Sequence, residues 1–196
     1  MKKIIIVFSV LLFPLFSSAQ LKALVGGTLI DGFGGTPIQN SVILIKGDQI
    51  IKVGHQGNVE IPSDAEIIST EGKSVLPGLW DMHVHLMING HSDYAHWDTA
   101  YIDDLESIIM PSSAHQLLMA GITSARDLGA PLEASINVRN RINKGIIPGP
   151  TMYMSGPFIQ HKPYPGTEAF RWGVKGAQDG RQKVRKLVEA GVDCIK

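Results

Sequence analysis

The sequence has 196 residues, and 18 Lys and Arg balance 18 Asp and Glu, so the formal net charge is zero. The chain therefore has no excess of basic residues that would attract nucleic acid or an anionic membrane surface, and we expect neither as a partner. The single cysteine, Cys194, excludes an internal disulfide. Stability must therefore come from a hydrophobic core, for which 44% apolar residues is adequate material.

Residues 1–19 have the pattern of a secretory signal peptide. Two lysines precede an apolar run from Ile4 to Phe16, and small residues follow it up to Ala19. The alternative is a membrane anchor, but the run is shorter than the roughly 20 residues of a spanning helix, and Pro14 would break its last turn. We therefore expect cleavage after Ala19 and an exported protein, periplasmic or secreted.

Residues 20–75 carry short apolar runs separated by turn residues, which predicts a β-rich segment. The runs predict strands over residues 23–30, 41–46, 49–53 and 66–70. Between the second and the third, Gly47 and Asp48 predict a two-residue hairpin turn.

The stretch over residues 75–86, Val-Leu-Pro-Gly-Leu-Trp-Asp-Met-His-Val-His-Leu, predicts a strand with a chelating face. Because side chains alternate in a strand, we expect Asp81, His83 and His85 on one face. On the other face we expect the apolar side chains Trp80, Met82, Val84 and Leu86. This pattern fits a barrel wall whose apolar side lies under helices. Two imidazoles at this spacing can reach one divalent ion, although the spacing alone also fits two core histidines.

Residues 87–101 are rich in His, Asp and aromatic side chains. In a βα barrel they would form the first loop on the face where active sites are built. His91 and His96 either touch the substrate or belong to a solvated loop, and the solvated loop is the commoner case. A helix over 112–120 and a strand over 122–128 are predicted next.

Arg126 and Asp127 lie at the end of that second strand, where they either serve the site or pair with each other, and we favour the pairing. A helix over 131–144 then leads to a third strand over 151–158. Alternation gives one face of this strand Tyr153 and Ser155, and the other face Met152 and Met154.

Residues 159–176 predict a loop that is long for a βα connection, and long loops are usually functional or mobile. The loop contains His161, Tyr164, Arg171 and Trp172. Among these, His161 is the first candidate for substrate recognition. An amphipathic helix over 178–190 and the start of a fourth strand over 192–196 follow. In that strand one face would carry Cys194 and Lys196.

The motif over residues 75–86 resembles the first barrel strand of the amidohydrolase superfamily, the metal-dependent TIM-barrel hydrolases. Imidazolonepropionase-like and Xaa-Pro dipeptidase-like members are the most similar. The resemblance continues through residues 121–129, 149–157 and 191–196. It implies an α/β fold, a (β/α)8 TIM barrel preceded by a small N-terminal β-sandwich segment. Such a barrel needs about 200 residues or more, so we expect only about its first four strands in residues 76–196, within the N-terminal fragment of a longer protein.

The resemblance also implies a metal centre. His83 and His85 would hold one ion, and Lys196, carboxylated on its amine, would bridge it to a second. The ions would be divalent, two Zn or alternatively Mn or Co. Asp81 is a candidate for orienting the ligands, and substrate contacts are expected from His161, Arg126 and Tyr153. The general-base Asp of the family would lie beyond Lys196, so we expect no catalytic residue among the 196.

The implied function is hydrolysis of a carbon–nitrogen bond in an amide, a cyclic amide or a dipeptide by a metal-activated water. The substrate would be a small molecule or dipeptide, and an oligomer is compatible with the sequence. The alternative is a truncated, catalytically silent exported fragment that at most binds metal. The two differ in whether the reading frame continues past Lys196 into strands with His, His and Asp. A third hypothesis, a β-rich binding module over residues 21–75, has less support, since this segment lacks the clusters of aromatic or charged residues that a ligand-binding surface usually has.

Overall fold

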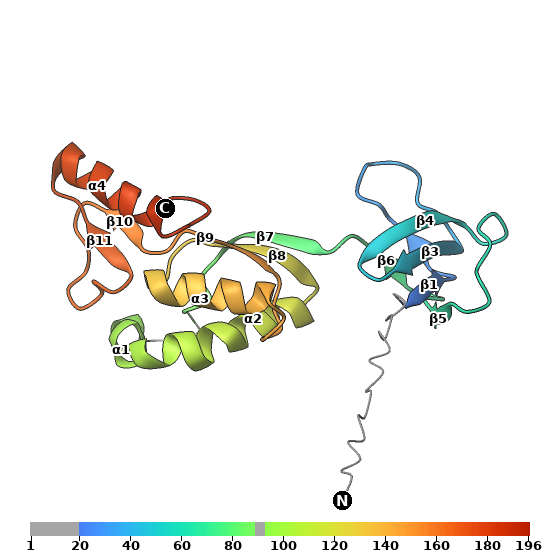
Figure 1. Ribbon diagram of the computed structural model, residues 1–196, viewed down its shortest axis with the longest axis horizontal. Coiled ribbons are helices and arrows are strands. Elements are labelled where there is room, and N and C mark those ends of the chain that lie inside the picture. Colours follow the sequence, from blue (N-terminus) through green and yellow to red (C-terminus); the bar gives the residue numbers. More distant parts are fainter. Residues whose placement is uncertain (1–19, 89–92) are drawn as a thin grey trace, which may run out of the picture. The chain divides into compact units, whose positions relative to one another are not determined.

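The computed structural model describes residues 20–88 and 93–196 (Figure 1), and the chain divides into two compact units between Pro77 and Gly78. The predicted signal peptide, residues 1–19, lies outside the described residues, and so does His91. None of the helices in the described part of the chain is long and apolar enough to cross a membrane.

The first unit is built around a four-stranded sheet with the order β4-β3-β1-β5. Its strands are β1 (Leu21–Val25), β3 (Ser41–Lys46), β4 (Gln49–His55) and β5 (Glu66–Ser69). β1 and β3 pair antiparallel, and β1 and β5 pair parallel. Lys46 faces Gln49 across the β3–β4 turn, and Gly47 has a φ of 62°, which confirms the predicted two-residue hairpin.

The single strand predicted over 23–30 is wrong, because the chain bends at Gly26. This residue has a φ of 98°, which interrupts the strand after Val25. The next strand, β2 (Thr28–Leu29), pairs instead with β6 (Ser74–Val75). The core of the first unit consists of Ala23, Val42, Leu44 and Val59.

The second unit contains a parallel sheet with the order β7-β8-β9. Its strands are β7 (Leu79–Val84), β8 (Ile122–Asp127) and β9 (Thr151–Met154). Between β7 and β8 the described elements are α1 (Tyr94–Ala100), η1 (Ile102–Asp104), the π-helical turn η2 (Leu105–Ile109) and α2 (Met110–Met119). Between β8 and β9 lies α3 (Leu132–Asn143). The unit therefore repeats strand and helix, as predicted for the start of a βα barrel.

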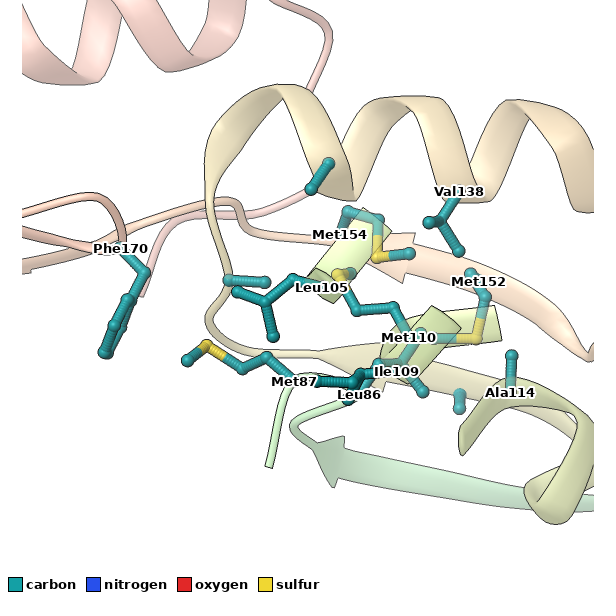
Figure 2. Packing of buried hydrophobic residues seen from close by; sticks show 13 residues of the cluster. Leu86, Met87, Leu105, Ile109, Met110, Ala114, Val138, Met152, Met154 and Phe170 are labelled. Atoms are coloured by element: carbon teal, nitrogen blue, oxygen red, sulfur yellow. The ribbon is translucent and has the colours of Figure 1, made fainter. Parts of the chain in front are cut away.

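The helices α2 and α3 cover one face of this sheet (Figure 1), and the main core lies between the helices and the sheet. Figure 2 shows Val138, from α3, above Met152 and Met154 of β9. These three side chains are at most 3% exposed, whereas Tyr153 between the two methionines is 39% exposed. The predicted alternation of faces is thereby confirmed for residues 152–154, whereas Ser155, predicted on the face of Tyr153, lies beyond the end of β9 and is buried.

The strand β7 does not keep one apolar face, and this part of the sequence prediction is wrong. The pairing of β7 with β8 shifts register between Asp81 and Val84, and such a shift reverses the faces on its two sides. Leu86 is buried in the core, but Trp80 and Met82 are 53% and 49% exposed. Trp80 stacks on Tyr153 with ring centroids 5.4 Å apart, so it lies on the side of the sheet that α2 and α3 leave open.

The predicted long loop over 159–176 is partly regular. β10 (Phe158–Gln160) and β11 (Arg171–Gly173) pair parallel within it, and Phe170 beside β11 is fully buried. The helix α4 (Gly176–Glu189) follows and ends before Gly191, whose φ is 84°.

The fourth strand predicted over 192–196 does not form. Asp193 donates its backbone N–H to Met154 O at 2.8 Å, but its side chain also accepts the Met154 N–H at 2.8 Å. A side chain thus takes the place of a backbone partner, and the ladder does not continue. Lys196 is held separately, through its carbonyl, which accepts the N–H of Ile159 at 2.9 Å.

Candidate metal centre

His85 follows β7 and is oriented by the backbone of the turn that follows the next strand, β8. Its Nδ1 lies 3.2 Å from the carbonyl oxygen of Gly129. Because a carbonyl only accepts hydrogen bonds, Nδ1 carries the proton in this contact and the lone pair lies on Nε2. Burial is the largest effect on the pKa of His85 and lowers it below 6.5, against the opposing hydrogen bond to Gly129, and the nearby positive charge of Lys196 lowers it further. The ring is therefore neutral near pH 7, as a metal ligand must be.

His83 lies beside His85, with ring centroids 5.3 Å apart and planes at 64°. The backbone N–H of His83 donates to Asp81 Oδ1 at 3.0 Å. Asp81 thus contacts the main chain of a candidate ligand rather than its ring. Its role as an orienting residue stays a prediction, and the contact would act through the local backbone where β7 shifts register.

Lys196 reaches the same place from the far end of the chain. Its Nζ lies 3.5 Å from Nε2 of His83. The fold therefore brings together all three residues predicted as metal ligands, although Lys196 is more than a hundred positions from the two histidines in the sequence. A free ammonium group donates to the lone pair that a metal would need, whereas a carboxylated lysine would not compete for it.

The donor set fits part of a divalent metal site. Two imidazoles side by side, with the Nε2 of His85 free of its proton, suit Zn²⁺ and its neighbours. Within residues 20–88 and 93–196 no three side chains from His, Cys, Asp and Glu converge as a metal-binding group. These residues therefore supply two imidazoles where a zinc site usually has three or four protein ligands.

Asp127 is a part of the site that sequence reasoning assigned wrongly. It does not pair with Arg126, because neighbours in a strand point to opposite faces. Arg126 donates from Nε to Met82 O at 2.9 Å, while Asp127 accepts the N–H groups of Leu86 at 3.1 Å and Gly129 at 2.9 Å. Burial raises the pKa of Asp127 to about 7. The signal that was available is Asp-X-Gly after a strand, which is typical of a turn closed by the Asp side chain.

Arg171, which the sequence placed in the long loop but not among the site candidates, is a second residue beside the site. Its guanidinium lies 4.8 Å from the ring centroid of Phe158, and that ring lies 5.3 Å from the ring of His85. Arg171 also forms an ion pair with Asp98 of α1, with Nη2 and Oδ2 3.6 Å apart and both side chains largely buried. A cavity of about 400 Å³ adjoins this pair, with Tyr164 in its wall.

The structure brings two of the residues predicted to contact substrate together and leaves the others apart. Tyr153 and Arg126 are register partners on β9 and β8, and Tyr153 stacks on Trp80. His161 is exposed in the turn after β10. His96 lies on α1 with its ring edge against Tyr101 at 5.7 Å. No contact between these side chains and the two candidate ligands fixes their roles, so the substrate contacts stay predictions.

Parallel strands joined by helices, with two histidines at the end of the first strand, define an α/β protein with a candidate metal centre at that strand end. The chain belongs to the amidohydrolase family, whose model matches residues 74–196, more than half of the chain. The resemblance inferred from the motifs is thereby confirmed, and the fold belongs with the TIM-barrel proteins of this superfamily.

The chain is similar to several enzymes of this kind. It is 48% identical to a dihydroorotase of Caldanaerobacter subterraneus subsp. tengcongensis over 67 residues, 34% of this chain and 14% of that protein. It is 41% identical to an imidazolonepropionase of Alkaliphilus metalliredigens over 56 residues, 27% of this chain and 13% of that protein. A solved prolidase in complex with N-methylphosphonate-L-proline has a TM-score of 0.74 and 26% identity, covering 90% of this chain and 46% of that one. The chain thus spans less than half of each.

Proposed function

We propose that the protein is a metal-dependent hydrolase that cleaves a carbon–nitrogen bond in a small molecule. The observation that carries the proposal is the pair His83 and His85, which lie side by side at the end of the first barrel strand with Nε2 of His85 available. Membership of the amidohydrolase family supports it. So do the names of similar proteins, a dihydroorotase, an imidazolonepropionase and a prolidase.

In this proposal the two imidazoles hold a divalent ion, Zn or alternatively Mn or Co. When bound, such an ion polarises a carbonyl group and makes a coordinated water acidic enough to react near neutral pH. His85 is kept in the ligating tautomer by its hydrogen bond to Gly129. Lys196, which lies 3.5 Å from His83, would carry a carboxylated amine and serve a second ion.

The finer proposal for the substrate is an Xaa-Pro dipeptide or a related amide. Its support is the likeness to a prolidase seen with a proline derivative. The cavity of about 400 Å³ next to Arg171 has the size of a small-molecule site. We further propose export to the periplasm or beyond, on the signal-peptide pattern of residues 1–19 alone.

The proposal is tested by metal binding to residues 20–196 and to its variants. We expect about one equivalent of Zn²⁺ by calorimetry and elemental analysis. Removal of both ligands in His83→Ala/His85→Ala should weaken binding by more than the roughly 10- to 100-fold that loss of an outer hydrogen-bond partner costs. His96→Ala is the matched control, an exposed histidine that should leave binding unchanged. Retention of zinc by the double variant would refute the metal centre. Zinc binding with no hydrolysis of dipeptides or cyclic amides, also in a protein continued past Lys196, would favour the silent metal-binding alternative.

A further inference from the structure

We propose that Asp127 is a positioning residue that holds His85 in its ligating tautomer by clamping both ends of the His85–Gly129 hydrogen bond. The tautomer part of this inference stands on the geometry of the chain, and its consequence for metal binding rests on the proposed function. Asp127 itself touches neither a metal ligand side chain nor a reacting group.

The two carboxylate oxygens of Asp127 have separate partners. Oδ2 accepts the backbone N–H of Leu86, the residue after His85, at 3.1 Å. Oδ1 accepts the N–H of Gly129 at 2.9 Å. Gly129 is the residue whose carbonyl accepts Nδ1–H of His85 at 3.2 Å. The Asp127 side chain thus fixes two backbone segments, the one that carries the imidazole of His85 and the one whose carbonyl accepts the hydrogen bond from that imidazole.

Asp127 is itself fixed in the sheet. It is 1% exposed, and its carbonyl accepts the N–H of Ser155 at 2.9 Å. The next residue, Leu128, donates its N–H to Val84 O at 3.0 Å. The main chain around Asp127 is therefore bonded to both flanking segments, so the carboxylate has a defined position from which to hold the two amides.

The packing at Gly129 makes this arrangement specific. A Cβ atom at Gly129 would overlap the ring of Phe158, and Phe158 also lies 5.3 Å from the ring of His85. A side chain at position 129 would therefore push this turn away from Phe158, and the carbonyl of Gly129 would move with it. The bond from Gly129 N–H to Asp127 is what closes that turn.

The clamp needs two acceptors, and this is why a carboxylate occupies the position. The side chain of Asn has one acceptor oxygen, and its NH₂ group would face one of the two N–H groups. Asp127→Asn keeps the size of the side chain but leaves either Leu86 or Gly129 without its acceptor. If the turn relaxes, Gly129 no longer fixes the proton on Nδ1, and Nε2 is protonated for part of the time. Loss of such an outer partner typically lowers metal affinity about 10- to 100-fold.

The experiment compares the chain with Asp127→Asn and with Val138→Ala at pH 8. Val138→Ala is the matched control, because it opens the core at a fully buried position of α3 without touching the turn. Long-range proton–nitrogen spectra of the metal-free proteins report the tautomer of His85, and titration with Zn²⁺ reports affinity. We expect the Nδ1–H form in the chain and in Val138→Ala, a mixed population in Asp127→Asn, and an affinity about 10- to 100-fold lower in that variant alone.

Two results would overturn the inference. One is Asp127→Asn with the tautomer and the zinc affinity of the parent chain; the other is Val138→Ala with the same losses as Asp127→Asn, which would make them effects of stability. If Asp127→Asn does not fold, the tautomer of His85 in the parent chain is still a test, because an Nε2–H form there refutes the clamp. A chain with the expected tautomer that binds no zinc would refute the proposed function while leaving the clamp in place.

Discussion

The buried carboxyl group of Asp127 should make the stability of the second unit depend on pH. Burial raises its pKa from 3.8 to about 7, so the folded chain binds a proton that the unfolded chain releases above about pH 4. The contribution of Asp127 to the free energy of unfolding is therefore largest below about pH 4, and it is lost as the pH rises toward 7. At about 1.36 kcal/mol for each pKa unit, the loss is on the order of 4 kcal/mol.

Urea unfolding measured between pH 4 and pH 8 checks this expectation. The parent chain should lose stability steadily across that range, and Asp127→Asn, which has nothing to titrate at this position, should show a clearly flatter profile. Equal slopes for the two proteins would mean that Asp127 is ionised throughout, held by the N–H groups of Leu86 and Gly129.

At this scale the sequence was informative about His83 and His85 and much less so about Asp127 and Arg171. The His-X-His spacing is a local pattern, so it can be recognised without the fold. The partners of Asp127 belong to Leu86 and Gly129, and those of Arg171 to Phe158 and Asp98. Most of these contacts join distant segments, and no spacing in the sequence encodes them.

At the scale of elements, the strand β9 should depend strongly on its buried face. Met154 is fully buried between β9 and α3, and Met→Ala at such a site typically costs about 2–5 kcal/mol, since it leaves a cavity. Met119, 75% exposed at the end of α2, is the matched control and should change stability by less than about 0.5 kcal/mol. Chemical unfolding of Met154→Ala and Met119→Ala measures the difference; comparable losses would contradict the packing of Figure 2.

Elements whose apolar residues keep one regular spacing were predicted well, whereas elements interrupted by a register shift or a side-chain hydrogen bond were not. The helix predicted over 131–144 is α3, Leu132–Asn143, because its apolar spacing runs without a break. The faces of β7 were wrong, since counting in twos assumes that no register shift intervenes after Asp81. The strand predicted over 192–196 failed because the side chain of Asp193 takes a backbone position in the ladder.

At the scale of the whole molecule, the first unit exposes apolar side chains on its edge strand β4. Ile50, Ile51 and Val53 on β4 are 66%, 52% and 44% exposed, and exposed apolar side chains on a sheet favour association. We expect residues 20–196 to associate with increasing concentration, and Ile50→Lys to shift gel-filtration and light-scattering profiles toward the monomer. Lys52→Gln, on the same strand, is the control. Profiles independent of Ile50→Lys would show that β4 takes no part in association.

The methionine-rich core has a consequence for oxidative damage. Sulfur atoms of Met87, Met110, Met152 and Met154 are buried in one cluster (Figure 2), while Met82 and Met119 are open to solvent. Oxidants convert methionine to a polar sulfoxide, which an apolar core cannot accommodate. The exposed methionines should therefore react first with little harm, and the buried ones only when the unit opens. Once they have reacted, the opened state cannot close again, so the lifetime of the fold under oxidants is set by how often it opens.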